Sequence, residues 1–123
     1  MWPFLGMSQM KASLLEYLGY PMQVFKNNFY TAMPRSGLGV CIARMNVGAF
    51  VQFFPWESTN PSATGHERYA NFITAKSTST MAESQELFTR WPHFHVVDMD
   101  DILLIKCAVE QGLEQLEKLH ATD

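Results

Sequence analysis

The sequence lacks the features that would place it among disulfide-stabilised, metal-binding or membrane proteins. It has only two cysteines, Cys41 and Cys107, which lie far apart in apolar segments and match no metal-binding spacing. We therefore expect two buried thiols and no disulfide. No apolar run approaches the roughly 20 residues that span a bilayer, and residues 1–6 lack the basic region of a leader peptide. These absences favour a protein of the cytoplasm, a reducing compartment, with no role in a membrane.

Signatures of catalysis are also scarce. Gly37 and Gly39 precede no predicted helix, so they indicate a turn rather than a phosphate-binding loop. Cys41 lies between two apolar residues with no histidine nearby in the sequence, which indicates a core thiol rather than a nucleophile. The sequence therefore predicts no catalytic residue and no cofactor.

His93 and His95 are the residues that most resemble metal ligands. They alternate on a predicted strand, so both rings should project from one face, and Asp98 follows closely. Their spacing matches no metal motif, however, and Asp98 is also suited to cap a helix. We interpret the histidines as side chains at a strand edge or an interface, with a metal site as the alternative.

What the chain does contain is apolar residues and unevenly distributed charge. Hydrophobic residues make up 47% of it and charged residues 17%, which predicts one globular domain over residues 1–123. Residues 1–97 carry five acidic and seven basic side chains, whereas residues 98–123 carry seven acidic and two basic. An acidic ridge of Glu110, Glu114 and Glu117 is expected on the last helix. It argues against nucleic-acid binding and suits a basic protein partner, although a solvated helix face explains it equally.

The N-terminal third predicts a helix followed by an extended segment. Ser8 is suited to cap a short helix that Gly19 ends. The apolar residues within 24–30 then indicate a first strand, interrupted by two asparagines.

A β-hairpin is the clearest sheet signal. Residues 39–45 and 49–54 predict its strands, and Gly48 is placed for the left-handed position of the connection. The second strand carries apolar side chains on both faces, so we expect it to be covered on both sides. Residues 56–65 predict a loop.

The following segment is ambiguous before a second helix begins. Residues 69–75 suit a helix or a strand, and we favour the strand. Thr80 and Glu83 form a capping box for a middle helix that Pro92 ends. Residues 94–97 predict a short last strand. The apolar side chains expected to be buried around the middle helix are Met81, Leu87, Phe88 and Trp91.

A long amphipathic helix is predicted over residues 98–119, with Asp98 as its N-cap. Its apolar stripe steps by three and four residues, and the stripe could pack on the protein's own sheet or reach a partner. The stripe consists of Ile102, Ile105, Val109, Gly112, Leu116 and Leu119, widened by Leu104, Ala108 and Leu113.

Aromatic residues beside prolines and loops are the second kind of partner-binding candidate. Trp56, Trp91 and Phe94 occupy such positions, and large aromatic side chains act as anchors when they are exposed at interfaces. Packing in the core is the alternative interpretation of all three.

These elements predict an α+β fold, in which an antiparallel sheet with a central hairpin is flanked by an N-terminal, a middle and a long C-terminal helix. This order of elements resembles the small dimeric chaperones of bacterial secretion effectors and the related YbjN-like fold. The resemblance implies a bacterial homodimer whose sheet and helical surfaces hold an extended segment of an effector.

Three functional hypotheses follow. The first is a non-enzymatic, chaperone-like protein-binding module. The second is an immunity or inhibitor protein that neutralises a toxin through the acidic last helix. The third is a small metal-binding or ligand-binding enzyme that uses His93 and His95.

Overall fold

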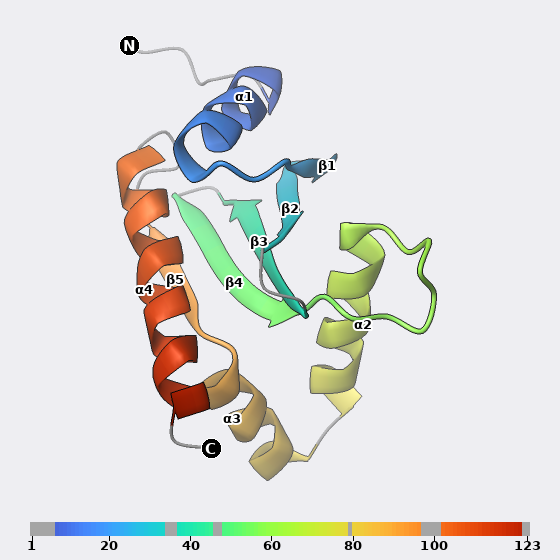
Figure 1. The fold of residues 1–123 in the computed structure, drawn as a ribbon. Helices are drawn as coiled ribbons and strands as arrows, with labels where there is room; N and C mark the ends of the chain where they lie inside the picture. The colour runs from blue at the N-terminus through green and yellow to red at the C-terminus, as the bar shows by residue number, and fades with distance from the viewer. Residues whose placement is uncertain (1–6, 34–36, 46–47, 79, 97–101, 122–123) are drawn as a thin grey trace.

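The protein forms a five-stranded antiparallel sheet flanked by helices, as seen in the computed structural model (Figure 1). The structure describes residues 7–33, 37–45, 48–78, 80–96 and 102–121. Neighbours in the sheet follow the order β1-β2-β3-β4-β5, so each strand pairs with the next one along the chain. The predicted α+β class is confirmed.

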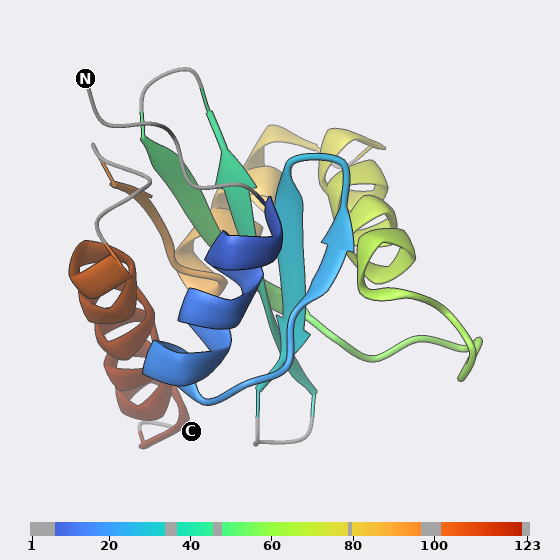
Figure 2. The same ribbon diagram turned by 90° about the horizontal axis from the view of Figure 1, so that it is seen from above.

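The elements have the following bounds. The strands are β1 (Gln23–Phe25), β2 (Asn28–Ala32), β3 (Leu38–Arg44), β4 (Ala49–Pro55) and β5 (His93–Val96). The helices are α1 (Met7–Leu18), α2 (Gly65–Thr78), α3 (Met81–Arg90) and α4 (Ile102–Ala121). Seen from above, α1 and α4 lie on one side of the sheet and α2 lies on the other (Figure 2).

The β3–β4 hairpin confirms the clearest sequence prediction. Gly48 has a φ of 78°, the left-handed region that glycine enters without steric cost. The Met45 backbone N–H donates to the Gly48 carbonyl over 3.0 Å. Along β4, Val51 and Phe53 point to the α1 and α4 side, here called the first face, while Gln52 and Phe54 point to the second face. All four side chains are buried, so the strand is covered on both sides from Val51 to Phe54, as expected.

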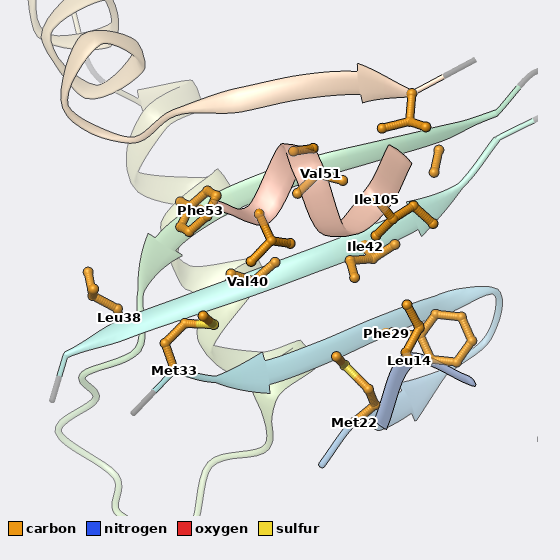
Figure 3. Close-up of a cluster of buried hydrophobic side chains, with 14 of the residues drawn as sticks. Leu14, Met22, Phe29, Met33, Leu38, Val40, Ile42, Val51, Phe53 and Ile105 are labelled. Carbon is orange, nitrogen blue, oxygen red and sulfur yellow. The ribbon is translucent and has the colours of Figure 1, made fainter. Parts of the chain in front are cut away.

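The main core lies between the first face and the helices α1 and α4 (Figure 3). Gly112 shows why a glycine interrupts the apolar stripe of α4, because a Cβ at this position would clash with the ring of Phe53. The predicted stripe therefore packs on the protein's own sheet. Its buried members include Ile105, Ala108, Val109 and Leu116.

The segment expected to form one first strand forms a hairpin instead. β1 and β2 pair in the register Phe25 with Asn28, and Lys26 in the turn has a φ of 54°. The polar residues that interrupted the predicted strand are those that make a tight turn favourable. This turn places β1 at the edge of the sheet.

The preference for a strand over residues 69–75 was wrong, because this segment lies within α2. A capping box begins the helix: the Glu67 N–H donates to Thr64 Oγ1 over 3.1 Å, and Glu67 Oε1 accepts from the Thr64 N–H over 3.3 Å. Helical periodicity then turns Tyr69 and Phe72 toward the sheet.

Three predictions of buried side chains were also wrong. Cys107 is exposed on α4, although both cysteines are free as expected. Leu104 is 41% exposed, so the apolar stripe is narrower than predicted, and Met81 is 80% exposed at the first position of α3. The α3 capping box is present, with the Glu83 N–H donating to Thr80 Oγ1 over 3.3 Å. The side chains of Leu87 and Phe88, and the predicted cap Asp98, lie outside the described residues.

Candidate interaction surfaces

Helix α2 covers only part of the second face. Its side chains Tyr69 and Phe72 pack on Phe54, with ring centroids 5.1 and 6.4 Å away. The second core beneath it contains buried Tyr30 and Cys41 as well. This half of the second face is therefore covered by α2, and its aromatic side chains form a second core.

Two titratable side chains in this second core are kept neutral by burial. Desolvation raises the pKa of the Cys41 thiol to about 12, and it also raises the pKa of Tyr69. A thiol that resists ionisation is a poor nucleophile, so the geometry agrees with the interpretation of Cys41 as a core residue.

A polar network fastens the edge hairpin to the start of α2. The Gln23 Oε1 accepts from the Gly65 N–H over 2.7 Å, and the Asn28 Nδ2 donates to the Tyr30 hydroxyl over 3.1 Å. The same hydroxyl lies 3.3 Å from Nδ1 of His66, whose ring stacks on Phe25 with centroids 3.7 Å apart. These contacts hold β1 against α2.

Gln52 marks the boundary of the covered half. Its Nε2 donates to the carbonyls of Phe53 and Trp91 over 2.7 and 3.2 Å, which ties the segment before β5 to β4. Its Oε1 is buried and has no hydrogen-bond partner among the described residues. A buried acceptor of this kind costs about 1–3 kcal/mol unless a donor reaches it.

Beyond Gln52 the second face is only partly covered. Strand register places one residue from each strand in a single row across it, here called the open sheet patch: Phe25, Asn28, Ala43, Phe50 and His95. Phe25 is 39% exposed, and Asn28, Ala43 and Phe50 are partly exposed. The ring of Phe50 lies 5.7 Å from that of His93, the next residue on this side of β5. A sheet face that meets water usually carries polar residues, whereas three of these five are apolar.

The strands that form the open sheet patch carry no acidic side chain. No Asp or Glu occurs between Glu16 and Glu57, a segment that includes four of the five strands, and β5 also has none. Lys26 lies 5.5 Å from the centroid of the Phe25 ring. Three of the chain's four histidines, His66, His93 and His95, adjoin or belong to the patch. One lysine and three histidines are therefore the basic side chains that the described part of the chain places at the patch.

A second exposed surface runs along α4. Leu103, Cys107, Glu110, Glu114 and Glu117 recur at steps of four and three, so they share one side of the helix, and all five are exposed. We call this set the α4 outer stripe. Leu103 is 63% exposed, and Lys118 forms an ion pair with Glu114 over 3.5 Å. The stripe is apolar near the start of the helix and acidic farther along.

The residues proposed from sequence for partner binding are thus separated. Glu110, Glu114 and Glu117 are brought together on α4, as expected from helical spacing. The aromatic residues are not: Trp56 contacts Arg68 and Phe54, Trp91 packs against both cores, and Phe94 packs on the first face. All three are partly buried by the protein's own residues, and their role in partner binding stays a prediction.

His93 and His95 are exposed and project from one face, as predicted. Asp98, the third residue of the alternative metal site, lies outside the described residues. Within the described part of the chain, no three His, Cys, Asp or Glu side chains are grouped closely enough to hold a metal ion. The residue that sequence reasoning missed is Phe50, because its partial exposure depends on where α2 stops covering the sheet.

Comparison with known proteins gives no further indication. No family model, curated protein or solved structure matches the chain. Among the described helices, none combines the length and the apolar character needed to cross a membrane.

Proposed function

We propose that this chain is a non-enzymatic, chaperone-like protein-binding module that holds a segment of a partner protein on the open sheet patch. The observation that supports it most is the row of Phe25, Ala43 and Phe50, three apolar side chains that stay partly exposed on the second face of the sheet. Exposed apolar side chains that gather on one face mark interaction sites in folded proteins.

The chemistry of the patch favours an apolar segment that carries acidic residues. The strands provide no carboxylate, and Lys26 at the rim attracts negative charge. A secreted effector in the cytoplasm is the partner that the resemblance to secretion chaperones implies, and the two free cysteines fit that reducing compartment.

Peptide phage display against the purified protein tests this proposal. Each round is first depleted on the empty capture support, and the selected peptides are then measured against the Phe50→Asp variant, whose added carboxylate should repel the expected ligand. We expect the selected peptides to combine apolar and acidic residues and to bind the wild type at least tenfold more tightly than the variant, which corresponds to about 1.4 kcal/mol.

A matched control is Met81→Asp, because Met81 is an exposed apolar residue on α3, outside the patch. Its affinity for the selected peptides should equal that of the wild type. Peptides that bind wild type and Phe50→Asp equally would contradict the proposal, provided that both proteins show the same thermal unfolding.

An inhibitor of a toxin is the second candidate, favoured by the alignment of Glu110, Glu114 and Glu117 on one exposed side of α4. In that case the α4 outer stripe would occupy a basic active site. Charge reversal at the three glutamates should then abolish toxin binding and leave peptide binding at the patch intact. Retained toxin affinity would eliminate this candidate.

A further inference from the structure

We draw no further inference here: the strongest candidate, the exposed edge of the sheet along β1, where the apolar side chains of Val24 and Phe25 are 42% and 39% exposed, carries none, because nothing in the described part of the chain shows what covers it.

Discussion

At the scale of single residues, the two cysteines show how position in the fold decides chemistry. Cys41 and Cys107 both sit in apolar sequence, yet Cys41 is buried under α2 and Cys107 is exposed on α4. The hydrophobicity of the sequence could not separate them, because β3 is covered on both faces at Cys41 whereas one side of α4 meets water. Solvent accessibility therefore gives Cys41 and Cys107 different chemical reactivity.

The raised pKa of Cys41 predicts a loss of stability in alkali. The thiol ionises near pH 9 in the unfolded chain but only at about pH 12 when buried, so the unfolded state releases its proton first. The free energy of unfolding should be unaffected by this group below pH 9 and should fall as the pH rises from 9 toward 12. Chemical denaturation across this range measures the effect.

Cys41→Ala is the control for this prediction. Burial also raises the pKa of Tyr30 and Tyr69, whose ordinary value is 10.0, so the variant should begin to lose stability about one pH unit later than the wild type. The same onset in both proteins would show that Cys41 does not contribute.

At the scale of secondary-structure elements, turn residues and capping residues predicted the correct element wherever they were recognised in the sequence. Gly48 and the alternation in β4 identified the central hairpin, and Thr80 with Glu83 identified the start of α3. The equivalent signal at Thr64 and Glu67 was present in the sequence and was missed, which is why α2 was mistaken for a strand. Recognition of that capping box would have resolved the ambiguity.

The Thr64→Ala substitution should weaken α2 by removing its cap. The hydroxyl of Thr64 accepts from the Glu67 N–H, and loss of such a cap costs about 1 kcal/mol of stability. Urea denaturation should show this decrease with an unchanged slope. Thr59→Ala, an exposed loop position in the same segment, is the control and should leave the midpoint unchanged.

At the scale of the whole molecule, two cores share one sheet. The first core lies beneath α1 and α4 and the second beneath α2, and Trp91 packs against both. The central strands β3 and β4 contribute side chains to each core, so neither core can be lost while the other keeps its sheet intact.

Unfolding should therefore be a single cooperative transition. A Trp2→Phe variant restricts tryptophan fluorescence to Trp56 and Trp91, both in contact with the second core, while far-ultraviolet circular dichroism reports all helices. The two urea midpoints should coincide. A fluorescence transition that precedes the loss of helix would show that unfolding is not a single transition.

The sequence by itself determined the α+β class, the hairpin, the long last helix and its acidic side, because each depends on local periodicity and turn chemistry. Tertiary structure alone decided the rest. Pairing of five strands aligned Phe25, Ala43 and Phe50 in one row, although they come from three separate strands. Where α2 packs on that face decided which row stays uncovered. An exposed surface depends on contacts between distant segments, and no local pattern in the chain encodes it.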